Sequence, residues 1–100
     1  MNSNFIAIDF ETATSNKMAC QIGITIVENG AIKDTIVRLI QPPNNKYDVG
    51  CIQVHHITPE QTSKSPTFDI VWEEIKYLFI NYDIVAHNAS FDESVLYANL

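Results

Sequence analysis

The sequence predicts one domain of the α/β class, in which an antiparallel three-strand meander and a parallel fourth strand form a mixed sheet with flanking helices. A chain of 100 residues with a hydrophobic fraction of 46% can build a single core. Three β-branched stretches lie within residues 5–40, a helical pattern spans residues 67–82, and a short apolar segment follows. Because a parallel strand needs a long crossover, usually a helix, this order fits a fourth strand parallel to an earlier one.

The first strand, Phe5 to Thr12, carries two acids in an otherwise apolar stretch. Side chains alternate along a strand, so Asp9 and Glu11 share one face, whereas Ile8 and Phe10 take the other. Two ionised carboxylates held close at the end of a buried strand repel each other and lose solvation, and a divalent metal ion removes both penalties. The alternative is a strand end that has reached solvent and carries two ordinary surface acids.

The next two strands are predicted on either side of a tight turn. After a polar loop at Ala13 to Lys17, the stretch Met18 to Val27 is rich in β-branched residues. Asn29 and Gly30 both tolerate the positive φ of a type I′ turn. The chain then returns along Ala31 to Ile40 and completes the meander.

The middle of the chain contains turn signals and one helix-start signal. Pro42 to Asn45 ends the sheet section, because proline cannot donate to a ladder and asparagine favours turns. We expect residues 41–56 to be irregular. Thr58 to Gln61 has capping-box spacing with a proline at the first helical position, which predicts a short helix that ends near Ser63.

A longer helix is predicted to begin near Thr67. Its apolar residues recur at the three- and four-residue spacings of one buried face. They are Thr67, Phe68, Val71, Ile75, Leu78, Phe79 and Tyr82. The segment Asp83 to Ala86 is too short for a helix and is expected to be a buried central strand.

The last helix is predicted after a turn at His87 to Ala89. Ser90 and Glu93 have the spacing of an N-cap and its partner, and apolar residues continue to Leu100. This start puts Asp92 at the second helical position. An acid there can simply complement the helix dipole, worth about 0.3 to 1 kcal/mol.

Asp92 also has a position that favours a site. It stands three and four residues before Val95 and Leu96, on the helix face that should pack against the sheet. If its helix follows a strand beside the first, Asp92 approaches Asp9 and Glu11. Three converging carboxylates suit two hard cations better than zinc. Two such ions can activate a water and stabilise a leaving oxygen at phosphorus, so the pattern indicates phosphodiester hydrolysis.

Candidate substrate contacts surround this centre. They are Thr12, His55, Ile57, Asn88 and Phe91. Several have a plain structural alternative: Phe91 can fill the core, His87 can be a hydrogen-bonded structural histidine, and His55 can be a surface residue.

The composition limits the partners. Six basic and twelve acidic residues give a net charge of −6, and no basic run marks a surface for long nucleic acid. Cys20 and Cys51 have no zinc-site spacing. Because the start at Met1 lacks a leader pattern and no apolar run approaches the roughly 18 residues of a membrane span, we expect a cytoplasmic protein with reduced thiols and no membrane partner.

The motifs together resemble the DnaQ-like (DEDDh) 3′→5′ exonucleases, which include the proofreading subunit of bacterial DNA polymerase III. Asp9 to Thr12 (Asp-Phe-Glu-Thr) resembles their first motif, and His87 to Asp92 (His-Asn-Ala-Ser-Phe-Asp) resembles their second. Three further segments are similar to the family's second strand, substrate loop and long helix. They are Gln21 to Gly23, Val54 to Thr58, and Ser65 to Phe68.

This resemblance implies a ribonuclease-H-like sheet, two Mg²⁺ or Mn²⁺ ions on Asp9, Glu11 and Asp92, and removal of nucleotides from a single-stranded 3′ end of DNA or RNA. Thr12, Asn88, Phe91 and the loop His55 to Ile57 would hold the terminal nucleotide. Ala13 departs from the family, where relatives often have threonine.

The family's third motif supplies a histidine base and a fourth aspartate, and neither has a counterpart before Leu100. We therefore expect residues 1–100 to be the N-terminal part of one exonuclease domain, truncated at its C-terminus and impaired in activity by itself. A non-catalytic module that docks nucleic-acid ends or a polymerase is the alternative. Self-association of the chain through an uncovered sheet edge is a further expectation.

Overall fold

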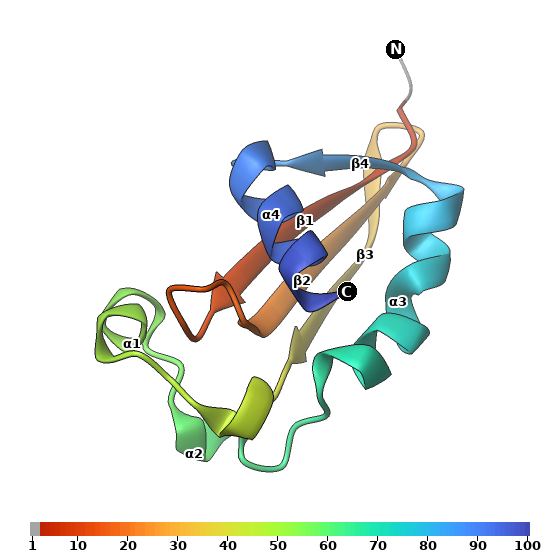
Figure 1. Cartoon of the computed structure of the whole chain (residues 1–100). Coiled ribbons are helices and arrows are strands. Elements are labelled where there is room, and N and C mark those ends of the chain that lie inside the picture. Colours follow the sequence, from red (N-terminus) through yellow and green to blue (C-terminus); the bar gives the residue numbers. More distant parts are fainter. Residues whose placement is uncertain (1–2) are drawn as a thin grey trace.

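The fold is a four-stranded mixed sheet with its two longer helices against one face, seen here in a computed structural model that describes residues 3–100 (Figure 1). The strand order is β3-β2-β1-β4, with β1 antiparallel to β2, β2 antiparallel to β3, and β4 parallel to β1. The elements are β1 (Phe5–Thr12), β2 (Ala19–Glu28), β3 (Ala31–Leu39), a 3-10 turn η1 (Pro43–Asn45), α1 (Val49–His55), α2 (Pro59–Thr62), α3 (Phe68–Asn81), β4 (Asp83–Ala86) and α4 (Ala89–Asn99). The predicted meander with a parallel fourth strand is confirmed.

The hairpin between β2 and β3 has the geometry expected from its two turn residues. Asn29 and Gly30 have φ values of 54° and 77°, and Glu28 pairs with Ala31 across the turn. Positive φ at both central residues is the mark of a type I′ turn, whose twist matches that of the strands it joins. The capping box before α2 is also confirmed, since the Thr58 N–H donates to Gln61 Oε1 at 2.8 Å.

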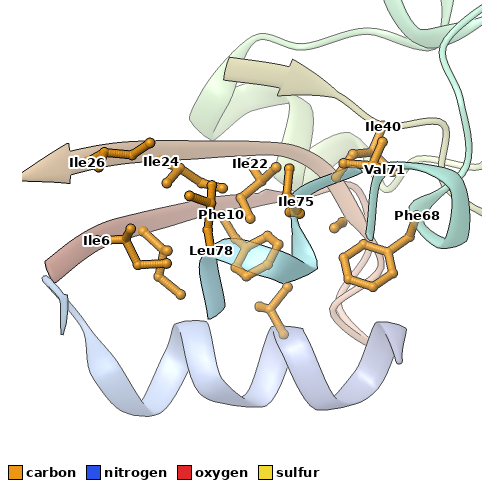
Figure 2. Packing of buried hydrophobic residues seen from close by; sticks show 13 residues of the cluster. Ile6, Phe10, Ile22, Ile24, Ile26, Ile40, Phe68, Val71, Ile75 and Leu78 are labelled. Atoms are coloured by element: carbon orange, nitrogen blue, oxygen red, sulfur yellow. The ribbon is translucent and has the colours of Figure 1, made fainter. Parts of the chain in front are cut away.

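The core lies between one face of the sheet and the helices α3 and α4 (Figure 2). Alternate residues of β1 and β2 point into it, and α3 adds the apolar face that its sequence spacing predicts. The labelled residues include Ile6, Phe10, Ile22, Ile24, Ile26, Phe68, Val71, Ile75 and Leu78. Because the even-numbered residues of β1 face this core, the odd-numbered acids of β1 must face away from it.

Three expectations for these elements are wrong. Residues 41–56 contain α1, a helix whose own residues are all at least partly exposed and so lack a periodic apolar face. β4 lies at the edge of the sheet, because no strand among residues 3–100 pairs with its other side, and Ile84 and Val85 are 46% and 49% exposed. α4 begins at Ala89 with Asn88 as its N-cap, two residues before the predicted N-cap Ser90.

Within residues 3–100, none of the helices has the length and apolarity that crossing a membrane requires.

Candidate metal centre

Two of the three acids stand on the end of β1 that extends past β4. β4 pairs with β1 only from Phe5 to Ile8, so the segment from Asp9 onward has no strand neighbour on that side. Asp9 is exposed and Glu11 is half-buried, whereas Phe10 between them is 2% exposed. Because side chains alternate along β1 and Phe10 faces the core, both carboxylates lie on the other face of the strand, in the part that β4 does not reach.

Asp92 fills part of this gap from α4. Its side chain is 2% exposed, and Oδ1 accepts the backbone N–H of Phe10 at 3.0 Å. This N–H lies just beyond the last β1–β4 pair, Ile8 with Ala86, so the Asp92 carboxylate takes the place of a strand carbonyl. The bond satisfies a buried donor and fixes the register of α4 against β1.

That contact also explains why the helix start differs from the prediction. The Asp92 N–H donates to Asn88 O at 3.0 Å, so the first turn of α4 closes on Asn88 instead of on Ser90. Asp92 is then the fourth helical residue rather than the second, and Ser90 lies inside the helix. Both Asn and Ser are good N-cap residues, so local propensity does not choose between them and the tertiary bond to Phe10 does.

The three carboxyl groups act on one another electrostatically. Burial is the largest cause of the raised pKa of Glu11, and the charges of Asp9 and Asp92 add to it. Burial is also the largest cause of the raised pKa of Asp92, and Asp9 adds to it, whereas the Phe10 N–H opposes the shift. Negative charge therefore accumulates at this end of β1, and a bound cation would relieve it.

The donor set fits a hydrated hard cation. Asp9, Glu11 and Asp92 offer carboxylate oxygens, the ligands that Mg²⁺ and Mn²⁺ prefer, and the exposure of Asp9 leaves room for water in the coordination shell. In the part of the chain that the structure describes, no three or more His, Cys, Asp or Glu side chains are gathered closely enough to hold a metal ion. The chemistry of the three carboxylates thus fits a hard cation, whereas the present positions of their side chains do not form a coordination site.

An open cleft of about 390 Å³ adjoins these carboxylates. It runs between the end of β1, the helix α1 and the start of α4. Its lining residues are Asp9, Phe10, Glu11, Thr12, Gly50, Cys51, Val54, His55 and Phe91. The α1 wall is the part that sequence reasoning missed, because α1 was expected to be irregular.

The predicted substrate contacts separate into two groups. Thr12, His55 and Phe91 line the cleft. Asn88 is exposed at the N-cap of α4, and Ile57 is 8% exposed and packs in a small second core with Ala13 and Cys20. Neither of these two lines the cleft, and their contact with a nucleotide stays a prediction.

His87 lies on the other side of Asp9. It lines a second open hollow, of about 450 Å³, over the face of the sheet that carries Asp9 and Gly23. Asp9 lines both hollows and therefore stands at the junction between them.

The sequence and the fold of the chain are similar to those of known exonucleases. The family model described as Exonuclease (RNase T) matches residues 6–100. The chain is 29% identical over 99 residues to the DNA polymerase III PolC-type of Mycoplasmopsis pulmonis (strain UAB CTIP). The aligned region is 96% of this chain and 7% of that protein. Exonuclease X in complex with 5′-overhanging duplex DNA matches with a TM-score of 0.77 and 26% identity, over 91% of this chain and 52% of that one.

A 3′-exonuclease that recognises the 3′ end of a histone mRNA stem-loop matches with a TM-score of 0.68 over 85% of this chain and 36% of that one. At 18% identity this likeness shows the fold alone. The chain therefore spans only about half, 52%, of the length of the Exonuclease X chain. The predicted ribonuclease-H-like mixed sheet is confirmed, and by its match over residues 6–100 the chain belongs to the exonuclease family.

Proposed function

We propose that this chain is the N-terminal part of a metal-dependent 3′→5′ exonuclease domain that hydrolyses phosphodiester bonds at nucleic-acid 3′ ends. The observation that carries the proposal is the Phe10–Asp92 hydrogen bond, which brings an acid 82 positions away to the two acids of β1. Membership of the exonuclease family supports the same reaction class.

In this proposal Asp9, Glu11 and Asp92 hold two divalent ions, Mg²⁺ or Mn²⁺. When bound, such ions supply an activated water and stabilise the leaving oxygen of an in-line displacement at phosphorus. The chain's own residues provide anionic oxygens on a rigid strand and on a helix registered against it. Their raised pKa values mean that ion binding must displace protons from Glu11 and Asp92 at low pH.

The cleft beside the acids would take the terminal nucleotide of a single strand. Thr12 and Phe91 line it near the carboxylates, and Val54 of α1 is 78% exposed on its wall. An aromatic side chain such as Phe91 can stack on any base, because every base has a π-face, and Val54 would add apolar contact. Asn88 and the loop from His55 to Ile57 complete the proposed substrate contacts.

The relatives support a proposal about the partners. Exonuclease X is described with duplex DNA and the 3′-exonuclease with a histone mRNA stem-loop, so we propose a DNA or RNA 3′ end as substrate. The PolC-type relative places a similar segment within a polymerase, which supports a polymerase or accessory domain as partner. Both cysteines are free, in keeping with a cytoplasmic location.

We propose that the isolated 100 residues have impaired activity, because a general base and a fourth carboxylate have no counterpart in the motifs present. A missing general base alone costs about 10²- to 10⁴-fold in rate. Near-normal, metal-dependent trimming of a 3′-labelled oligonucleotide by these residues would refute this part of the proposal.

Calorimetric titration with Mn²⁺ tests the site itself. We expect the wild-type chain to bind Mn²⁺, and Asp9→Asn and Asp92→Asn to weaken binding strongly. Glu60→Gln is the matched control, because Glu60 is an exposed acid outside the cleft and should leave binding unchanged. Unchanged Mn²⁺ binding in both aspartate variants would overturn the proposal.

The alternative is a docking module for nucleic-acid ends or a polymerase, which the PolC-type relative favours. It predicts partner binding that does not depend on Mn²⁺ and that survives Asp9→Asn. A pull-down of a polymerase fragment with and without a chelator separates the two functions.

A further inference from the structure

His55, the last residue of α1, uses both ring nitrogens within the chain. Its Nε2 lies 2.8 Å from the backbone oxygen of Thr12, and its Nδ1 accepts the backbone N–H of Ile57 at 2.9 Å. An N–H can only donate, so Nδ1 carries no proton. The proton of the neutral ring is therefore on Nε2, which donates it to the Thr12 carbonyl.

The two bonds join segments that the sheet does not hold. Thr12 follows Glu11 at a register shift between β1 and β2, where regular pairing is interrupted. Ile57 belongs to the loop after α1 and is anchored in the second core with Cys20. The Cys20 thiol lies close to these two bonds, with Sγ 3.7 Å from His55 Nε2 and 3.5 Å from the Glu11 backbone oxygen.

The helix α1 has few other attachments. None of its residues is buried, and Val49 and Val54 are 69% and 78% exposed. Its start is tied to the loop after β1 by Asp48, whose N–H donates to Ala13 O at 2.8 Å and whose Oδ2 accepts the Ser15 N–H at 2.7 Å. Its end is tied by His55. With no apolar face to hold it, α1 depends on polar ties at both ends for its distance from the carboxylates.

We propose that His55 is a positioning residue for substrate binding: its neutral ring, protonated on Nε2, ties the α1 wall of the cleft to the end of β1. Both nitrogens are occupied, so His55 shapes the cleft and does not exchange protons with the substrate. The inference rests on the proposed function for the identity of the ligand. The tie itself, from Thr12 through His55 to Ile57, can be tested without any ligand.

Three variants of the full chain separate the two ends of the tie. His55→Ala removes both bonds, His55→Asn keeps an amide oxygen near the Nδ1 position for Ile57, and His55→Gln keeps an amide N–H near the Nε2 position for Thr12. His56→Asn is the matched control, because His56 is the exposed neighbour with a φ of 62° that asparagine tolerates.

Two measurements need no ligand. Long-range ¹H–¹⁵N correlation spectra of the wild-type chain should show the Nε2-protonated tautomer of His55. Amide hydrogen exchange of Ile57 and of α1 should accelerate by roughly tenfold or more in His55→Ala. His55→Asn should protect Ile57 and leave the Thr12 end loose, and His56→Asn should match the wild type. An Nδ1-protonated ring, or unchanged exchange in His55→Ala, would overturn the proposal.

The ligand measurement uses a short single-stranded phosphorothioate DNA, labelled at its 5′ end, with Mn²⁺ present. Fluorescence anisotropy should show roughly tenfold weaker binding for His55→Ala, partial recovery in His55→Gln, and Mn²⁺ affinity within about twofold of wild type in all variants. Equal oligonucleotide affinity in wild type and His55→Ala would refute the positioning role. If the wild type bound neither Mn²⁺ nor DNA, the proposed function and the substrate role of His55 would fail together, whereas the spectra would still decide the tie.

Discussion

Replacing Asp92 tests whether its carboxylate has one role or two. Asp92→Ala removes the acceptor of the buried Phe10 N–H at 3.0 Å. An unsatisfied buried donor costs about 1 to 3 kcal/mol, and each kcal/mol lowers the Tm of a domain this size by roughly 4 to 8 °C. Asp92→Asn keeps an amide oxygen for the same N–H and removes a charge that burial disfavours, as the raised pKa of Asp92 shows.

In a chelator at neutral pH we therefore expect Asp92→Ala to melt roughly 5 to 20 °C below the wild type and Asp92→Asn to melt at or above it. With Mn²⁺ at one hundred times its Kd, the wild type should gain about 2.7 kcal/mol, and neither variant should gain comparably. Differential scanning fluorimetry measures both effects, with Glu93→Gln as the neighbouring exposed control.

Two results would refute this reasoning. If Asp92→Asn were as unstable in chelator as Asp92→Ala, the hydrogen bond to Phe10 would not be what Asp92 contributes to the fold. If Mn²⁺ raised the Tm of Asp92→Asn as much as that of the wild type, Asp92 would not be a metal ligand.

Three further predictions concern pH, packing and assembly. The pKa values of Glu11 and Asp92 are raised in the folded chain, so protonation of these groups contributes stability that is complete below their ordinary pKa values of 4.5 and 3.8. This contribution is lost as the pH rises through the pKa values of the folded chain. Urea unfolding should therefore show a flatter dependence of stability on pH for Asp92→Asn than for the wild type, and an identical dependence would contradict the raised pKa of Asp92. Thr62→Val should lower the free energy of unfolding in urea by about 1 to 3 kcal/mol. The fully buried Thr62 hydroxyl is hydrogen-bonded to the Tyr47 hydroxyl at 2.7 Å and to Asn45 Oδ1 at 2.8 Å. Thr35→Val, at an exposed position of β3, is the control and should change the stability little. Light scattering should show mass rising with concentration, because no strand within residues 3–100 pairs with the outer edge of β4 and Ile84 is 46% exposed. Ile84→Lys should suppress the rise, and a wild-type monomer at every concentration would exclude self-association by this edge.

The sequence by itself determined the elements that depend on neighbours along the chain. The alternation in Phe5–Thr12 assigned Asp9 and Glu11 to one face, since a strand repeats every second residue. Asn29 and Gly30 specified their turn through their tolerance of positive φ, and the capping box placed the start of α2.

The tertiary structure decided what depends on residues far apart in sequence. It selected Asn88 over Ser90 as the N-cap of α4, because the Asp92 carboxylate of this helix bonds to the Phe10 N–H of β1. It holds α1, which has no periodic apolar face, through Asp48, which bonds to the loop after β1, and through His55, which bonds to Thr12 at the end of β1.

These outcomes have one physical cause. Local patterns reflect backbone preferences of at most about 1 kcal/mol per residue, whereas a buried polar group without a partner costs about 1 to 3 kcal/mol. Where the two compete, as at the start of α4 and the end of α1, the long-range hydrogen bond decides. The motifs could therefore indicate which acids form the candidate site, but only the fold could show that Asp92 reaches β1 through the Phe10 N–H and that His55 ties α1 beside it.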